Sequence, residues 1–203
     1  MKRITFVAGG MALGMNRLLP ASGRAVDEVY VAGLADETTA LEGRYDQADL
    51  VQLMDSAVGH YERCVSLLDY TSTNGAHRQL QVVAGATALL VGILARDTGM
   101  WAWSRQYTSS ARDLAQEADH GGLEARAKSS LGILYSPLLG DGSHADVRRC
   151  VEEAEHAHRL AARFAPPAMR SFASAQLGVA YALDKQAGRG AQGAVPGGHA
   201  PER

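Results

Sequence analysis

The segment Leu131-Gly132-Ile133-Leu134-Tyr135 decides the fold, because two close variants of it occur elsewhere in the chain. The variants are Val91-Gly92-Ile93-Leu94 and Leu177-Gly178-Val179-Ala180-Tyr181, so the three glycines are 40 and 46 residues apart. A second phrase follows the first two copies, as Ala111-Arg112-Asp113-Leu114-Ala115 and then Ala157-His158-Arg159-Leu160-Ala161. Self-similarity at such a spacing indicates a helical repeat protein. A glycine inside a helix costs about 1 kcal/mol relative to alanine. We therefore predict that each glycine lets the first helix of a pair lie close against the second.

Around these segments, apolar residues recur every three or four positions from Val26 to Lys185, which is typical of helices. Breaks rich in glycine, proline and aspartate divide this stretch into seven predicted helices, at residues 27–42, 46–69, 76–97, 100–118, 122–136, 144–164 and 167–184. We expect Asp46 and Ser143 to be N-caps and Asp97-Thr98-Gly99 to end the third helix. The predicted class is all-α, with antiparallel helix pairs stacked one upon another.

Both ends of the sequence differ from this stretch. Residues 1–26 form a segment in which Lys2 and Arg3 precede an apolar run, Ile4–Met15. A basic start before a short apolar run is typical of a secretory signal peptide, so export is the alternative to the cytoplasmic location that we expect. The repeat domain is assigned to residues 27–185. Residues 186–203 are rich in glycine and proline, and we predict a disordered tail there.

The composition limits the classes of function. The chain has 203 residues, 46% of them hydrophobic and 21% charged, with a formal net charge of −2. These values predict one globular domain without a general electrostatic reason to bind nucleic acid or an anionic membrane. We expect no transmembrane span. The only cysteines, Cys64 and Cys150, lie far apart in helical stretches, so we interpret both as core residues rather than a disulfide or metal ligands.

The motifs Leu131-Gly132-x-x-Tyr135 and Leu177-Gly178-x-x-Tyr181 resemble the Leu-Gly-x-x-Tyr core of the tetratricopeptide (TPR) repeat. Ala111 follows Gly92 by 19 residues, as an alanine of that family's second helix does. The stretch from Leu90 to Asp119 also resembles the repeat domains of actinobacterial helix-turn-helix transcriptional regulators. The resemblance implies a right-handed TPR-like solenoid that acts as a protein-interaction or regulatory module. The 26 residues before the repeats are too few for a DNA-binding domain, so we expect no direct binding of nucleic acid.

In TPR proteins the first helices of the pairs line a concave face that binds a peptide or a small effector. The resemblance assigns five residues to this groove by their distance from the repeat glycines: Arg96, Arg126, Ser129, Ser136 and Phe172. Two arginines in one groove would grip a carboxylate or a phosphate. The alternative interpretation of both arginines is an ordinary solvated side chain.

Two further surfaces are predicted from apolar residues. Trp101 and Trp103 are two positions apart on one helix, so we expect Trp101 in the core and Trp103 half-exposed, as a candidate interface anchor. The seventh helix carries the first-helix segment but no second helix follows it. We therefore expect its apolar residues Leu177, Val179 and Leu183 to be covered by a partner or by another subunit in a homo-oligomer.

The competing function is that of a helical-bundle enzyme or metal-binding protein. Glu153/His156 and Glu155/His158 both have the Glu-x-x-His spacing that di-metal bundles use. Both pairs share one helix and face different ways, whereas a di-metal site needs the motif on two helices. We therefore predict no catalytic set, no metal site and no cofactor.

Overall fold

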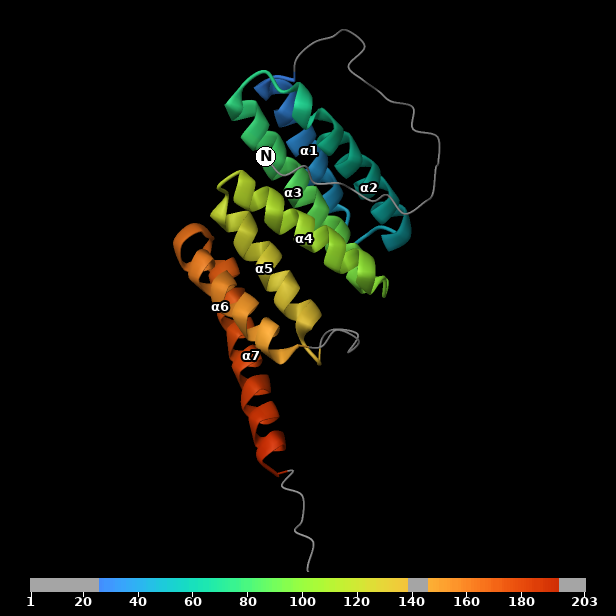
Figure 1. Ribbon diagram of the computed structural model, residues 1–203. Coiled ribbons are helices and arrows are strands. Elements are labelled where there is room, and N and C mark those ends of the chain that lie inside the picture. Colours follow the sequence, from blue (N-terminus) through green and yellow to red (C-terminus); the bar gives the residue numbers. More distant parts are fainter. Residues whose placement is uncertain (1–25, 139–145, 194–203) are drawn as a thin grey trace, which may run out of the picture.

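The computed structural model describes residues 26–138 and 146–193 of the chain (Figure 1). Within these residues it contains seven α-helices and one short 3-10 helix, and no strand. The helices are α1 (Glu28–Gly43), α2 (Leu50–Leu67), η1 (Leu68–Tyr70), α3 (Asn74–Asp97), α4 (Trp101–Glu117), α5 (Gly121–Tyr135), α6 (Val147–Phe164) and α7 (Pro167–Gly193). The predicted all-α class and the seven helices are confirmed. Of the predicted N-terminal segment, the structure describes only Val26, which is buried and paired with Thr71.

The helix ends differ from the prediction in detail. Helix α2 is capped by Asp49, whose carboxylate accepts hydrogen bonds from the backbone of Val51 and Gln52. The predicted cap at Asp46 is wrong, because the backbone bonds to Arg44 form a turn that delays the start of the helix. Ser143 lies outside the described residues. The predicted stop of α3 is confirmed, with Gly99 in the left-handed region at φ 77°.

Helix α7 is longer than predicted, since it continues past Gln186 to Gly193. The tail assigned to residues 186–203 therefore begins too early by eight residues. The extension alternates residues of high helix propensity, Ala187, Arg189, Ala191 and Gln192, with three glycines.

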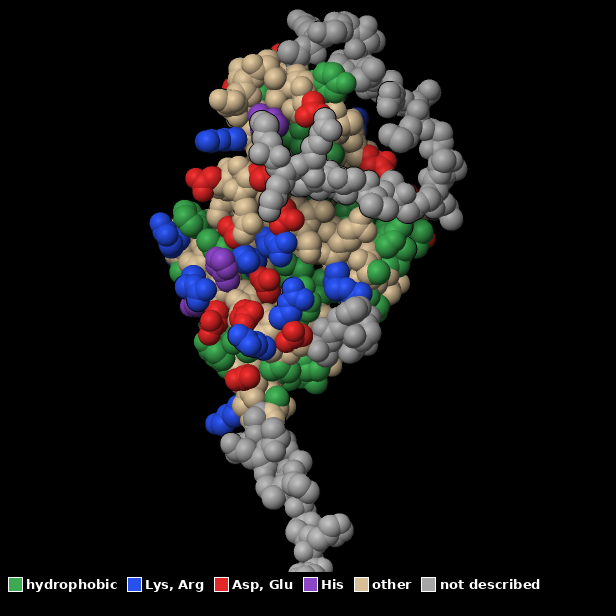
Figure 2. Space-filling view, in the orientation of Figure 1, with side chains coloured by type: hydrophobic (Ala, Val, Ile, Leu, Met, Phe, Trp, Pro, Cys, Tyr) green, Lys and Arg blue, Asp and Glu red, His purple; other side chains and the backbone are tan. Residues whose placement is uncertain are grey.

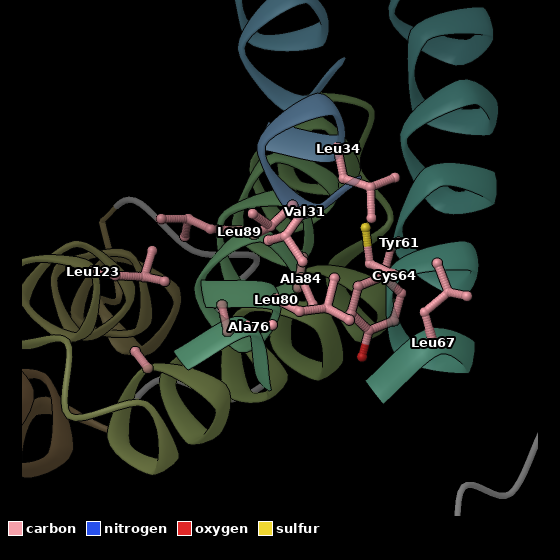
Figure 3. Close-up of a cluster of buried hydrophobic side chains, with 14 of the residues drawn as sticks. Val31, Leu34, Tyr61, Cys64, Leu67, Ala76, Leu80, Ala84, Leu89 and Leu123 are labelled. Atoms are coloured by element: carbon pink, nitrogen blue, oxygen red, sulfur yellow. The ribbon is translucent and has the colours of Figure 1, made fainter. Parts of the chain in front are cut away.

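Helix α3 is the centre of the packing. It contacts α1, α2, α4 and α5, and its Leu80, Ala84 and Leu89 lie among side chains from three of these helices (Figure 3). These partners come from α1, α2 and α5: Val31, Leu34, Tyr61, Cys64, Leu67 and Leu123. Cys64 is a free, fully buried thiol, and burial raises its pKa to about 11. Cys150 is also free and buried, so both cysteines are core residues as predicted.

By length and hydropathy alone, α3 would also suffice to cross a membrane. In the folded chain, however, 72% of its most apolar window is buried inside the molecule, which is the usual situation of a core helix.

The contacts between helices follow a regular order. Each helix contacts the next one along the chain, and the odd-numbered helices also contact each other in series, α1 with α3, α3 with α5 and α5 with α7. Among the described helices, the backbones of α2, α4 and α6 do not come close to one another, although the Tyr61 ring of α2 packs edge-on against the Tyr107 ring of α4, with the ring centroids 5.4 Å apart. The odd-numbered helices therefore lie side by side and share one face of the molecule.

The three repeat glycines have different surroundings. A Cβ atom at Gly92 would collide with the side chain of Thr108 on α4 and would lie 3.2 Å from its backbone nitrogen. At Gly132 the nearest atom is the carbonyl oxygen of Cys150 on α6, at 3.6 Å, which is ordinary contact. At Gly178 nothing lies within 4 Å. The predicted close packing of two helices at the glycine is thus confirmed at Gly92. At Gly132 the two helices are in ordinary van der Waals contact, and at Gly178 no helix of the described chain lies close.

We predict that Gly92→Ala lowers the free energy of unfolding by about 1–3 kcal/mol, because the added methyl group forces α3 and α4 apart. Gly59 is the matched control, since it lies in the middle of α2 with nothing within 4 Å of an added Cβ. Gly59→Ala should raise the free energy of unfolding by up to about 1 kcal/mol through helix propensity. Urea unfolding followed by circular dichroism measures both changes. Equal effects of the two substitutions would contradict the close contact.

Candidate functional site

A hollow lies on the face formed by α3, α5 and α7. It has a volume of about 600 Å³ and is lined by α3, α5, the end of α6 and the start of α7. Arg126 and Phe172, two of the five predicted groove residues, both line it. The other lining residues are Val82, Ala86, His120, Gly122, Leu123, Phe164, Ala165, Pro166, Ala168 and Met169. The lining is therefore apolar, with one arginine and one histidine.

Two glycines at the start of α5 shape this hollow. A Cβ atom at Gly121 would collide with the ring of Phe164, and one at Gly122 would lie 3.2 Å from the Phe164 carbonyl oxygen. Because neither glycine has a side chain, the end of α6 lies directly against the start of α5. The ring of Phe164 is held at the rim, with the residue 52% exposed.

Arg126 supplies the permanent positive charge of the hollow. Its guanidinium forms an ion pair with Glu42 of α1 at 3.3 Å, and 44% of its side chain is exposed. An ion pair this exposed contributes little to stability, because water competes for both partners. His120 caps the N-terminus of α5, where its Nδ1 accepts a hydrogen bond from the backbone amide of Leu123 at 3.1 Å. Arg126 is thus the lining group best able to exchange its partner for a ligand anion.

The other three predicted groove residues lie elsewhere. Arg96 pairs with Asp97 at 2.8 Å near the end of α3 and is not among the residues that line the hollow. Ser129 and Ser136 are only 1% and 2% exposed, so their assignment to an open groove is wrong. Ser129 lies one turn before Gly132, on the side of α5 that α6 covers, and Ser136 lies one turn after it.

Of the four predicted interface residues, two are exposed and two are partly or fully buried. Trp103 is 43% exposed and lies 6.0 Å from the ring of Tyr107, and Val179 is 41% exposed. Leu177 is half-buried against a small cluster that includes Cys150, and Leu183 is buried at 6% exposure. The prediction of an open face at Leu183 is wrong, because this side chain is buried inside the described fold.

Trp101 is only partly buried and belongs to none of the core clusters. Its predicted place in the core is therefore wrong. The first turn of α4 lies at the edge of the packing rather than inside it.

The Glu-x-x-His residues of α6 are engaged in other contacts. Glu153 pairs with Lys128 of α5 at 3.1 Å, and His158 Nδ1 lies 3.2 Å from the hydroxyl of Ser174 on α7. Burial lowers the pKa of His156 below its ordinary value. In the described part of the chain, no group of three or more histidine, cysteine, aspartate or glutamate side chains is placed to hold a metal ion.

Charges of both signs are intermixed on the visible surface. Figure 2 shows lysine and arginine side chains next to aspartate and glutamate over the lower half of the molecule in this view. Along helix α6, charges of opposite sign are paired, Arg148 with Glu152 at 3.0 Å and Arg159 with Glu155 at 3.7 Å. This face therefore has no continuous patch of one sign.

Sequence reasoning missed a buried polar cluster between α1, α2 and α3. Its central residue is His60, which is 6% exposed and adjoins a second hollow of about 380 Å³ between α1 and α2. His60 Nε2 lies 2.9 Å from the hydroxyl of Thr38, which lies 3.0 Å from the hydroxyl of Thr87. Polar residues at core spacing, such as Thr38 between Leu34 and Leu41, are the signal that would have found this cluster.

The hydrogen bonds assign one protonation state to His60. The Arg63 guanidinium lies 2.9 Å from His60 Nδ1 and can only donate, so Nδ1 accepts and the proton is on Nε2. The protonated Nε2 lies 2.9 Å from the Thr38 hydroxyl and 3.2 Å from the Leu34 carbonyl oxygen, which can only accept. The hydroxyls of Thr38 and Thr87 lie within hydrogen-bond distance of each other, and each also has a backbone acceptor, Leu34 O at 3.1 Å for Thr38 and Val83 O at 2.9 Å for Thr87. A proton added at Nδ1 would break the bond from Arg63.

The surroundings of His60 lower its pKa below the ordinary value of 6.5. The main cause is burial, which disfavours the charged ring, and a hydrogen bond to the Leu34 carbonyl oxygen opposes it in part. Glu37 Oε2 lies 3.3 Å from Nδ1, but its carboxylate is paired with Arg63. The folded chain therefore holds a neutral histidine in its core.

No family model matches this chain, and neither the curated proteins nor the solved structures contain a match.

The lowered pKa of His60 predicts that the chain loses stability in mild acid. As the pH falls below about 6.5, the unfolded chain binds protons before the folded chain does. The free energy of unfolding should therefore fall, by at most about 1.4 kcal/mol per pH unit for one such group, until the folded pKa is passed. His60→Gln keeps a donor toward Thr38 and should flatten this slope in urea titrations between pH 7 and pH 5.

His156 serves as the comparison for that measurement, because its pKa is lowered as well. His156→Gln should remove a further part of the slope, and the double variant should have a smaller slope than either single variant. A slope that is the same in the wild type and in His60→Gln would contradict the neutral, buried state of His60.

Proposed function

We propose that this chain is a peptide-binding module whose groove is the apolar hollow on the face of α3, α5 and α7. In this proposal the helices form antiparallel pairs, α3 with α4 and α5 with α6, stacked as a TPR-like right-handed solenoid. The serial contacts of the odd-numbered helices support this arrangement. The observation that carries the proposal is that Arg126 and Phe172, which the TPR resemblance assigns to the groove, line the same hollow.

The lining determines the kind of peptide. Phe164 and Phe172 are each about half exposed, and Met169 and Val82 are half-buried between them and the core. Apolar side chains of a peptide gain most by covering such surface. Arg126 adds a bidentate donor for a carboxylate, which would take the place of Glu42. The groove therefore favours a segment with apolar anchor residues and an acidic residue beside them.

The exchange at Arg126 has a low energetic cost. The Arg126–Glu42 pair is solvent-exposed on both sides, so breaking it loses at most about 1 kcal/mol. A ligand carboxylate enclosed by the phenylalanine rings is shielded from water, where a charge-assisted hydrogen bond contributes more. Arg126 accordingly selects for acidic peptides, while the apolar lining supplies most of the affinity.

Selection from a random peptide library displayed on phage tests this function. We expect the peptides enriched on the immobilised chain to share an acidic residue next to apolar ones. In fluorescence anisotropy, Arg126→Ala should weaken binding of such a peptide about tenfold, which corresponds to about 1.4 kcal/mol. Phe164→Ser should weaken it by at least as much, because it removes half of the aromatic rim.

Arg148→Ala is the matched control. Arg148 is also an arginine paired with a glutamate, and its side chain is 89% exposed on α6, away from the hollow. Its substitution should leave the peptide affinity unchanged. The proposal fails if no peptide is enriched, or if Arg148→Ala weakens binding as much as Arg126→Ala does.

A further inference from the structure

The hollow between α1 and α2 shares no lining residue with the proposed peptide groove. Its volume of about 380 Å³ is within the range of small-molecule sites. Four ionisable side chains line it, Glu37 and Arg44 from α1 and its end, and His60 and Arg63 from α2. Gly59 keeps the hollow open, because a Cβ atom at this residue would meet nothing within 4 Å. Unlike the apolar groove, this hollow therefore has the lining of a site for a charged molecule.

The two arginines of the hollow differ in how they are held. Arg44 is exposed, and its side chain forms no hydrogen bond or ion pair with any described residue. Arg63 pairs with Glu37 and also donates to His60 Nδ1 at 2.9 Å. Its Nε is buried without a hydrogen-bond partner among the described residues, so this guanidinium is only partly satisfied where it lies. With His60 neutral, two positive charges and one negative charge leave the hollow one net positive charge.

A proton on His60 changes the group with which Glu37 pairs. Glu37 Oε2 lies 3.3 Å from His60 Nδ1, close to the Arg63 nitrogen that donates there. A protonated Nδ1 can no longer accept from Arg63, and it carries a hydrogen that it can donate to Glu37. The side chains of Arg63 and Glu37 are 35% and 53% exposed, so this exchange needs no rearrangement of the core. With Glu37 neutralising the imidazolium, the hollow is left with two net positive charges, those of Arg44 and Arg63.

The other described groups that face His60 do not titrate below pH 8. Thr38 of α1 and Thr87 of α3 present hydroxyl groups to this cluster. Cys64 of α2 has its Sγ 3.8 Å from Nε2, but burial raises the pKa of this thiol to about 11. The pair of charged side chains at Nδ1 is therefore the part of the surroundings that responds to a proton on the ring.

We propose that the α1–α2 hollow binds a small molecule through a doubly charged oxyanion held between Arg44 and Arg63, and that binding is coupled to protonation of His60. Guanidinium groups suit phosphate and carboxylate oxygens, because they offer paired N–H donors. The hollow is larger than an inorganic oxyanion, and Ala40 and Leu41 supply apolar surface for the rest of the ligand. Binding is tighter in mild acid, and by linkage the bound anion raises the pKa of His60.

Sulfate is the probe for this site, because it keeps two negative charges between pH 5.0 and pH 7.5. In NMR titrations of the full ¹⁵N-labelled chain, with the ionic strength held constant by sodium chloride, sulfate should shift the amide signals of residues 40–44 and 59–63. We expect its affinity to be about tenfold higher at pH 5.0 than at pH 7.5, since one more positive charge faces the ion. No saturable shift at either pH, or equal affinity at both, overturns the proposal.

Substitutions in the hollow assign the roles of its residues. Arg44→Gln should weaken sulfate binding about tenfold at both pH values. Arg148→Gln is the matched control, because Arg148 is an arginine on α6 whose side chain is 89% exposed, and it should leave the affinity unchanged. Glu37→Gln releases Arg63 without a proton, so at pH 7.5 this variant should bind sulfate about as tightly as the wild type does at pH 5.0. The affinity of His60→Gln should be the same at both pH values.

Two results with these variants contradict the site. One is an equal sulfate affinity of the wild type and Arg44→Gln, and the other is a Glu37→Gln chain that binds sulfate no more tightly than the wild type at pH 7.5. Circular dichroism of each variant verifies that it remains folded. Peptide affinity measured on Arg44→Gln should equal that of the wild type, because Arg44 does not line the peptide groove.

Discussion

The close contact between α3 and α4 is the constraint on which the rest of the structure depends. It exists because Gly92 has no side chain, and the Ser104 hydroxyl donates a hydrogen bond to the Gly92 carbonyl oxygen at 2.6 Å across the two helices. Gly85 repeats the arrangement two turns earlier, where a Cβ would lie 2.9 Å from Leu123 of α5. Helices α4 and α5 pack closely on the side of α3 that carries Gly85 and Gly92. The other sides of α3 are buried against α1 and α2.

The groove follows from the same packing. Since α4 packs on Gly92 of α3 and α6 packs on Gly132 of α5, another side of each of these odd-numbered helices is left uncovered. Val82 and Ala86 of α3, Leu123 of α5 and Met169 of α7 all line the hollow. Gly121 and Gly122 then bring Phe164 to its edge. The proposed peptide-binding surface is present in the unliganded chain, so binding there would need little rearrangement.

Apolar periodicity was sufficient to predict the seven helices, even for α3, which is buried on almost every side because it contacts α1, α2, α4 and α5. Of the five residues that the TPR resemblance assigns to a groove, Arg126 and Phe172 line the hollow, and their role in binding stays a prediction. Ser129 and Ser136 were misplaced because a sequence pattern does not say how far α6 overlaps α5. Leu183 was misplaced because it lies with Ala173 and Ala180 among the buried residues of α7, whereas Phe172 and Val179 are exposed. The His60 cluster could not be predicted, because Thr38, His60 and Thr87 come from three different helices and form no recognisable motif in the sequence.

The central claim is that peptides bind on the face of the odd-numbered helices. Amide chemical-shift mapping by NMR, with a library-selected peptide added to the ¹⁵N-labelled chain, tests it most directly. The account predicts that the largest shifts fall in residues 82–86 of α3, 122–126 of α5 and 164–172 around the start of α7. Shifts centred on the α1–α2 hollow near Glu37 and Arg63, or on the outer sides of α4 and α6, would contradict it.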